Sequence, residues 1–137
     1  MEMKRIKYVA LNPRQKEIYN FQKVAALLAD YGFNCIKLSD DWLGADFLAY
    51  HKDHRDTLKV QLKARPAIHK NYIGKRLYIA FPLKSKWYLL EHDELVSLVG
   101  EHSKWLKTKS WRHNGFYHSD APNGGLLKCL QRHVVGA

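Results

Sequence analysis

Three polar residues near the middle of the chain have the chemistry needed to hold a metal ion beside a phosphodiester. Asp46 interrupts an apolar run, and Gln61 and Lys63 follow it after a short polar stretch. Phosphodiester hydrolysis near neutral pH needs a cation beside the phosphate, an activated water and fixed groups that align them. A carboxylate and an amide oxygen suit Mg²⁺, which takes few protein ligands and keeps several waters. These residue types therefore predict an Mg²⁺ site, in which Mn²⁺ can substitute, with a lysine beside it.

Two predicted strands carry these residues. The segment Ala45–His51 is mostly apolar, whereas Thr57–Arg65 alternates between apolar and polar residues on either side of a polar loop. Strict alternation indicates a strand with one buried face. A hairpin of these strands would bring Asp46 beside Gln61, and Lys63 would point the same way because strand side chains repeat with a period of two.

A long helix is predicted before the hairpin. Asn12 and Pro13 form a favourable helix start, and Gly32 suits a helix end. Apolar residues recur at three- and four-residue spacing in between, so one stripe of the helix must pack against a core. Glu17 and Asn20 lie along one edge of that stripe.

The remaining segments complete a single α/β (α+β) domain over residues 1–137. Strands are predicted over 33–38, 77–81 and 87–90, with a turn-rich stretch over 39–44. A helix capped by Asp93 is predicted to run through Val99, and another spans 126–134. Residues 103–125 hold several aromatic side chains without a clear period, and we expect an irregular segment there.

The motif around Asp46 resembles a known family. Residues 44–49 (GADFLA), followed by a polar hairpin and residues 60–63 (VQLK), are similar to the PD-(D/E)XK nuclease superfamily, as in its homing-endonuclease and resolvase-like members. The resemblance implies a restriction-endonuclease-like αβββα core with the site at the edge of a mixed sheet. It also implies that Asp46 and Gln61 bind the metal and that Lys63 positions or activates the attacking water.

Two departures from the family pattern bear on the metal site. No proline precedes Asp46, and Gln61 stands where most members have an acid. A glutamine in this position occurs in active members of the family, and its carbonyl oxygen can still bind Mg²⁺. The lost negative charge calls for a further carboxylate, which members of the family commonly take from the first helix. Glu17 is the predicted catalytic and metal-binding residue there, with Asn20 as its competitor.

The charge of the chain favours DNA as the partner. Twenty-three Lys and Arg residues against thirteen Asp and Glu residues give a formal net charge of +10. Such a charge attracts a polyanion, although many basic domains are merely soluble. Arg65, Lys70, Lys75 and Arg76 are the predicted contacts to the DNA backbone, while a solvated loop would explain them almost as well.

The sequence thus predicts a metal-dependent DNA endonuclease, and two alternatives stay open. One is a non-catalytic nucleic-acid-binding module that retains the nuclease fold, and the other is a basic surface for an acidic protein partner. We expect a homodimer or higher symmetric oligomer, because cutting two strands usually requires two sites. Two dispersed cysteines, with no membrane span or signal peptide, predict a cytoplasmic protein.

Overall fold

The computed structural model of the chain describes residues 1–136, with Asp41 described by its backbone only. A six-stranded mixed sheet has the strand order β1-β2-β3-β5-β6-β8, and β4 and β7 form a second, two-stranded sheet. The elements are α1 (Pro13–Ala29), β1 (Phe33–Trp42), β2 (Ala45–His51), β3 (Thr57–Leu62), β4 (Ala67–His69), β5 (Leu77–Leu83), β6 (Lys86–Glu91), α2 (His92–His102), β7 (Phe116–His118), α3 (Gly124–Leu130) and β8 (Val134–Val135). The predicted α+β class with a central mixed sheet is confirmed.

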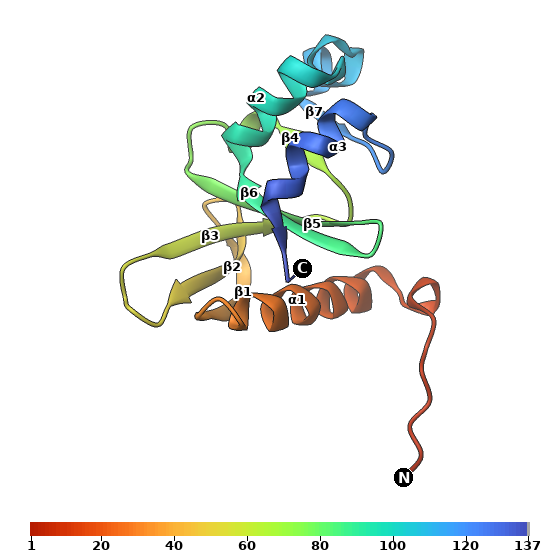
Figure 1. The fold of residues 1–137 in the computed structure, drawn as a ribbon, viewed down its shortest axis with the longest axis vertical. Coiled ribbons are helices and arrows are strands. Elements are labelled where there is room, and N and C mark those ends of the chain that lie inside the picture. Colours follow the sequence, from red (N-terminus) through yellow and green to blue (C-terminus); the bar gives the residue numbers. More distant parts are fainter. Residues whose placement is uncertain (137) are drawn as a thin grey trace.

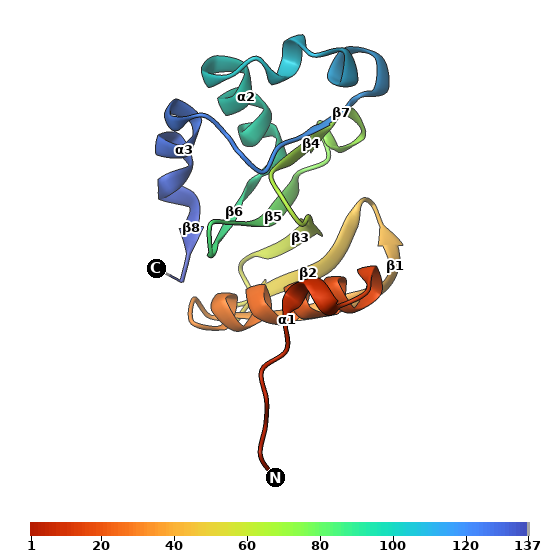
Figure 2. The same ribbon diagram turned by 90° about the vertical axis from the view of Figure 1, so that its right-hand side faces the viewer.

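Helix α1 begins where its capping residues predict. The Asn12 side chain accepts a hydrogen bond from the Gln15 backbone N–H at 2.8 Å, and the Gln15 side chain accepts one from the Asn12 N–H at 2.9 Å. This capping box satisfies two N–H groups that the first helical turn leaves free. Val24 and Leu28 on the buried side of α1 are almost fully inaccessible. Figures 1 and 2 show the helix along strands β1 to β3, at the end of the molecule away from α2 and α3.

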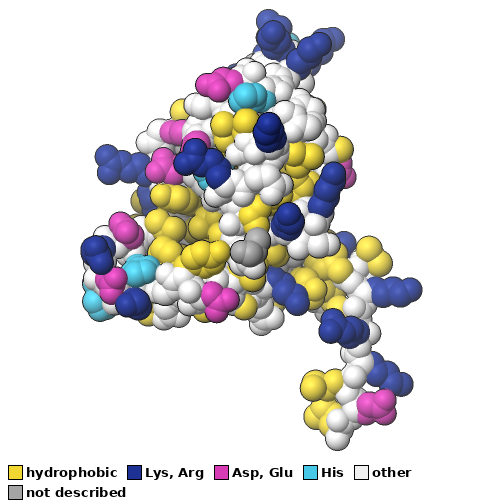
Figure 3. All heavy atoms as spheres, viewed as in Figure 1, with side chains coloured by type: hydrophobic (Ala, Val, Ile, Leu, Met, Phe, Trp, Pro, Cys, Tyr) yellow, Lys and Arg dark blue, Asp and Glu magenta, His cyan; other side chains and the backbone are white. Residues whose placement is uncertain are grey.

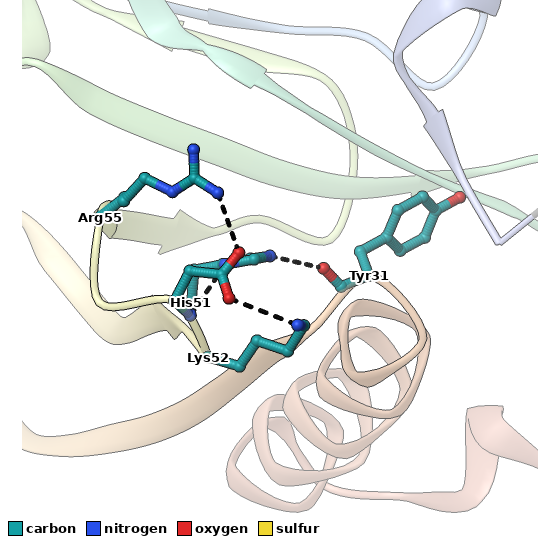
Figure 4. A network of polar contacts seen from close by, with 5 residues as sticks. Tyr31, His51, Lys52 and Arg55 are labelled. Carbon is teal, nitrogen blue, oxygen red and sulfur yellow. Dashed lines mark hydrogen bonds and ion pairs between the residues drawn. The ribbon is translucent and has the colours of Figure 1, made fainter.

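Strands β2 and β3 form the predicted antiparallel hairpin. Phe47 lies opposite Val60, and both are fully buried against α1 in the first of two core clusters. The far end of the hairpin is tied to the end of α1 by His51 (Figure 4), whose Nε2 donates to the Tyr31 carbonyl at 3.1 Å. Its Nδ1 accepts from the Asp53 N–H at 3.2 Å, which fixes the tautomer. The hairpin is therefore anchored at the end away from Asp46.

The parallel pairing of β3 with β5 joins the hairpin to the rest of the sheet. Leu62 of β3 lies beside Ala80 of β5, and the chain between these strands passes through β4 and a 3-10 turn, Lys70–Tyr72. The antiparallel pair β4 and β7 brings Ile68 beside Tyr117. A second core cluster gathers around β5, β6, α2 and α3, at the opposite end from α1.

The structure corrects several predicted boundaries. Strand β1 continues to Trp42, so the turn before β2 consists of Leu43 and Gly44 alone. Strand β3 ends at Leu62, three residues before the predicted Arg65. The prediction of Asp93 as helix cap is wrong, because Glu91 occupies the cap position and makes no side-chain cap bond. Asp93 instead accepts from the Gly74 N–H at 2.9 Å.

Candidate active site

The backbone ladder between β2 and β3 stops just before the predicted site. Regular pairing runs from Tyr50 and Thr57 to Phe47 and Val60, although β2 begins at Ala45 and β3 continues to Leu62. Beyond the last pair with β2, β3 keeps its other neighbour, β5, and the Lys63 N–H still donates to the Ala80 carbonyl at 2.9 Å. The N–H groups of β3 that would face β2 at this end therefore need another acceptor.

The Asp46 carboxylate is that acceptor. Its Oδ2 accepts one hydrogen bond from the Leu62 N–H at 2.8 Å and another from Gln61 Nε2 at 2.9 Å. Both fall on the same oxygen, and Oδ1 accepts none from the residues that the structure describes. The carboxylate is thus fixed in direction by backbone and side chain together, with one oxygen left for another ligand.

The amide of Gln61 is oriented by its two acceptors. Besides Asp46, its Nε2 lies 3.4 Å from the Leu62 carbonyl oxygen. Two acceptors on one side favour placing the NH₂ group there, so the carbonyl oxygen Oε1 points the other way. Gln61 therefore donates to Asp46 and still offers an oxygen, the group that a hard cation binds.

A bulge in β1 forms a wall of the cleft that contains Asp46. Lys37 pairs with Phe47 and Trp42 pairs with Ala45, so the four residues 38–41 of β1 stand opposite the single residue Asp46. Extra residues in one strand bend it locally and leave backbone groups unpaired. A cleft of about 490 Å³ results, and it is lined by Arg14, Glu17, Lys37, Leu38, Ser39, Asp40 and Asp46.

Of the two candidates on the first helix, the structure places Glu17 in this cleft. Glu17 is exposed and shares the cleft with Asp46. Asn20, one turn further along α1, is 7% exposed and its Nδ2 donates to the Tyr8 hydroxyl at 2.9 Å. Asn20 lines a neighbouring hollow and not the cleft around Asp46.

The electrostatics of the cleft act on Asp46 in both directions. Burial raises the pKa of this carboxyl above its ordinary value, and the negative charge of Glu17 raises it further. The hydrogen bond from Leu62 and the charges of Lys37 and Lys63 lower the pKa. Desolvation is the largest of these effects, so the folded chain holds the ionised carboxylate at a cost. A cation in the cleft would offset that cost.

Lys63 is the residue directly after the end of β3. Its Nζ lies 5.4 Å from the centre of the Tyr72 ring, within the range of a cation–π contact. Lys63 is half-buried and close enough to Asp46 for its charge to act on the carboxyl. It does not line the cleft in this conformation; it lines the neighbouring hollow together with Glu17. A lysine side chain has four rotatable bonds, which let the ammonium reach a phosphate from this position.

The donor set fits Mg²⁺ rather than a metal that needs a cage of protein ligands. Across the described side chains, no three His, Cys, Asp or Glu residues gather as a metal cluster. The carboxylates of Asp46, Glu17 and Asp40 line the cleft without forming such a cluster, and the Gln61 amide is hydrogen-bonded to Asp46. Mg²⁺ commonly binds through one or two carboxylates, waters and substrate phosphate oxygens. The residues present thus suit that ion.

The similar solved structures include two nucleases. One is the Holliday junction resolvase Hjc from the archaeal hyperthermophile Archaeoglobus fulgidus, at 14% identity and a TM-score of 0.45 over 57% of this chain and 74% of that one. The other is the bacterial homing endonuclease I-Ssp6803I, at 15% identity and a TM-score of 0.46 over 63% of this chain and 70% of that one. No family model matches the chain, and neither does any curated protein.

The predicted DNA contacts lie outside the cleft. Arg65, Lys75 and Arg76 are exposed, and the Lys75 carbonyl accepts from Lys59 Nζ at 2.9 Å. Lys70 is exposed as well, and its Nζ lies 5.5 Å from the Trp111 ring. Their role in DNA binding stays a prediction.

Sequence reasoning missed the basic residues of the cleft, Arg14 and Lys37. Arg14 was detectable, because it precedes Glu17 by three residues and therefore lies on the same side of the helix. The place of Lys37 depends on the register of β1, which the sequence does not reveal.

None of the helices within residues 1–136 is long and apolar enough to cross a membrane.

Proposed function

We propose that the protein is a metal-dependent DNA endonuclease that hydrolyses phosphodiester bonds at the cleft around Asp46. The observation that supports this most strongly is the fixed Asp46 carboxylate, which Leu62 and Gln61 hold at the point where two strands part. A partly buried carboxylate whose pKa is raised by burial is typical of a functional site. The positive net charge of the chain supports DNA as the substrate.

Each residue has a proposed part in the reaction. Asp46 and Glu17 would hold Mg²⁺, which supplies positive charge to offset the charge that develops on the phosphate, and the Gln61 carbonyl oxygen would join them once the amide turns its oxygen toward Asp46. Gln61 also keeps the Asp46 carboxylate in one orientation through its own N–H. The ammonium of Lys63 would donate hydrogen bonds to the attacking water or to a phosphate oxygen.

Arg14 and Lys37 supply the positive charge at the rim of the cleft. Both line the cleft beside three acidic residues. Their side chains would bind the phosphates that flank the reacting one, which positions the DNA without reading its sequence. Binding at several phosphates fixes the scissile bond relative to Asp46, and such positioning lowers the barrier of the chemical step.

The test is cleavage of supercoiled plasmid and of branched DNA by the purified protein. We expect nicked or linear products with Mg²⁺ or Mn²⁺ and none with EDTA. Asp46→Ala and Lys63→Ala together should abolish cleavage, with circular dichroism as the control for folding. Cleavage that survives the double substitution would overturn the proposal, because it would come from another site or a contaminating enzyme.

A second candidate is a nucleic-acid-binding module without catalysis. It is favoured by the hydrogen bond from Gln61, which satisfies Asp46 Oδ2 in the absence of any metal. Calorimetric titration with Mg²⁺ separates the two candidates. The endonuclease predicts binding that Asp46→Ala removes, whereas a pure binder predicts DNA affinity with no heat from Mg²⁺.

The proposed enzyme would act as a symmetric pair, since two sites related by a twofold axis cut two antiparallel strands. Light scattering at micromolar concentration tests this directly. A single species with the mass of one 16.0 kDa chain, both with and without DNA, would rule the pair out.

A further inference from the structure

A ladder of lysines and tyrosines lies along α1 and the short turn before it, on the side that faces the hollows next to the cleft. The Tyr8 and Tyr19 rings lie 5.2 Å apart, centre to centre, at an angle of 57°. Lys16 Nζ lies 5.3 Å from the Tyr8 ring, and Lys23 Nζ lies 5.2 Å from the Tyr19 ring. The order along the surface is therefore lysine, tyrosine, tyrosine, lysine. We call these four residues the α1 ladder.

The α1 ladder borders two hollows that continue from the cleft. The first hollow, of about 220 Å³, shares Glu17 with the cleft and also contains Lys63 and Lys16. The second hollow, of about 640 Å³, shares Tyr8 with the first and is also lined by Trp87. Because neighbouring spaces share lining residues, the three lie in a row along α1, and we call that row the path. It runs from Asp46 past Lys63 to the aromatic end.

The path combines an apolar lining with positive charge. Three lysines and one acid, Glu17, are the charged residues that line the two hollows. The aromatic rings are partly exposed, and the Tyr8 ring is held in place because its hydroxyl accepts from the buried Asn20 amide. Trp87 packs against the core cluster that includes Val24, and it also lines the larger hollow. Fixed aromatic faces beside ammonium groups suit unpaired nucleotides, which stack their bases and bring phosphates.

The N-terminal segment, which Figures 1 and 2 show extending away from the rest of the molecule, carries further positive charge up to Tyr8. Lys4, Arg5 and Lys7 lie in an exposed segment that joins α1 through the short turn containing Tyr8. Figure 3 shows Lys and Arg side chains beside hydrophobic ones where this segment meets α1.

Double-stranded DNA hides the faces of its bases within the stack, so an aromatic surface contributes little to binding an intact duplex.

We propose that the path along α1 binds a single strand of DNA that leaves the cleft, with Tyr8, Tyr19 and Trp87 stacking on unpaired bases. This deepens the proposed function, on which it rests, by assigning the substrate class as DNA with unpaired nucleotides next to the cleavage point. Lys16 and Lys23 contact the backbone of that strand. Three lysines against one acid along the path favour a polyanion over a peptide or a second copy of the chain.

Fluorescence anisotropy of a labelled oligothymidylate in EDTA tests the proposal without any cleavage. Tyr19→Ala should weaken binding about tenfold, whereas Tyr19→Phe, which keeps the ring, should bind like the unchanged protein. Lys23→Gln should weaken binding and reduce its dependence on salt by roughly one phosphate contact. Lys128→Gln on α3, an exposed lysine at the other end of the molecule, is the control of equal charge.

The outcomes separate this proposal from the catalytic one. Asp46→Ala should keep the affinity for the single strand, so loss of cleavage with retained binding leaves the ladder assignment intact. Equal affinity of Tyr19→Ala and the unchanged protein would overturn it. So would equal losses from Lys23→Gln and Lys128→Gln, which would show attraction by overall charge alone. If Tyr19→Ala unfolds, the two lysine variants still decide.

Discussion

The side-chain amide of Gln61 donates a hydrogen bond to the carboxylate of Asp46 across the gap where β2 and β3 part, at 2.9 Å. The pair combines a neutral donor with a partly buried acid, and the same amide keeps an oxygen free for a cation. The charge balance of the site therefore depends on residue 61, and exchanging its amide for an acid changes the metal affinity and the stability in opposite directions.

Gln61→Glu should make the protein more dependent on metal. Two carboxylates at hydrogen-bond distance repel, and Asp46 loses a donor, so the variant should be less stable in EDTA by about 1–3 kcal/mol. Mg²⁺ should raise its Tm more than it raises that of the unchanged protein, because a bound ligand stabilises the folded state. Gln61→Met, of similar length without an oxygen, should show a smaller Mg²⁺ effect. Identical Mg²⁺ shifts in all three proteins would place the metal elsewhere.

Asp46→Asn should raise the stability of the metal-free protein while abolishing cleavage. Burial raises the folded-state pKa of Asp46, so the folded protein disfavours the ionised form and loses stability as the pH rises through that pKa. The neutral amide escapes this loss and can still accept from the Leu62 N–H. Thermal unfolding in EDTA should show a higher Tm for Asp46→Asn at neutral pH and a difference that shrinks on acidification. A lower Tm across the whole range would contradict the sign.

Lys63→Ala should slow cleavage at least about 100-fold, the typical effect of removing a group that assists proton transfer. Lys59→Ala is the matched control, because Lys59 lies on the same side of β3 and donates to the Lys75 carbonyl away from the cleft. Its cleavage rate should stay close to that of the unchanged protein. Single-turnover kinetics at saturating Mg²⁺ measures both rates. Equal losses in the two variants would reduce the role of Lys63 to general DNA attraction.

Glu17 and Asn20 should separate in their effects. Glu17→Gln removes a carboxylate from the cleft and should raise the Mg²⁺ concentration for half-maximal cleavage about tenfold or more, with little change in Tm. Asn20→Ala breaks a partly buried hydrogen bond to Tyr8 and should cost about 1 kcal/mol of stability without changing the Mg²⁺ dependence. The reverse pattern would assign the missing ligand to Asn20.

Acid should destabilise the end of the molecule that contains His92. This side chain is fully buried, and its Nε2 accepts from the His69 N–H at 3.0 Å. Burial, with the nearby His69 and Lys63, lowers its pKa, while Asp93 raises it. The lowered pKa means that the unfolded state binds the proton more tightly, so stability is present above pH 6.5 and is lost as the pH falls below it.

Each such proton contributes a slope of up to about 1.4 kcal/mol per pH unit. Burial lowers the pKa of His69 in the same direction. Unfolding by urea between pH 7 and pH 5 measures the slope, and His92→Gln should flatten it even though the variant is less stable overall. An unchanged slope in His92→Gln would show that other groups take up the protons.

Local signals predicted the parts of the fold that local chemistry decides. The start of α1 follows from Asn12 and Pro13, and the alternation from Thr57 to Leu62 gave the buried face of β3. Pairings between distant segments carried no such signal. The antiparallel pair of Ala67–His69 with Phe116–His118 joins two three-residue strands, each too short to show a period.

The candidate site shows the same division. The types and spacing of Asp46, Gln61 and Lys63 were visible in the sequence, and the structure brings Gln61 into contact with Asp46 as the strand period requires. The cleft that receives them depends on a bulge whose extra residues only a known register reveals. For the same reason the position of Lys37 in the cleft could not be predicted from the sequence.

Most strands use the same residues to pair with a neighbour and to shape the adjacent surface, whereas the bulge of residues 38–41 shapes the wall of the cleft without one-to-one pairing. Because these residues have no one-to-one partners on β2, their number can change without shifting the pairing of Phe47 with Val60. Relatives of this chain with longer or shorter segments between Lys37 and Trp42 would keep Asp46 in place while offering a differently shaped wall to a bound substrate. Insertions and deletions in this segment can therefore change the substrate preference without changing the strand pairing of the sheet.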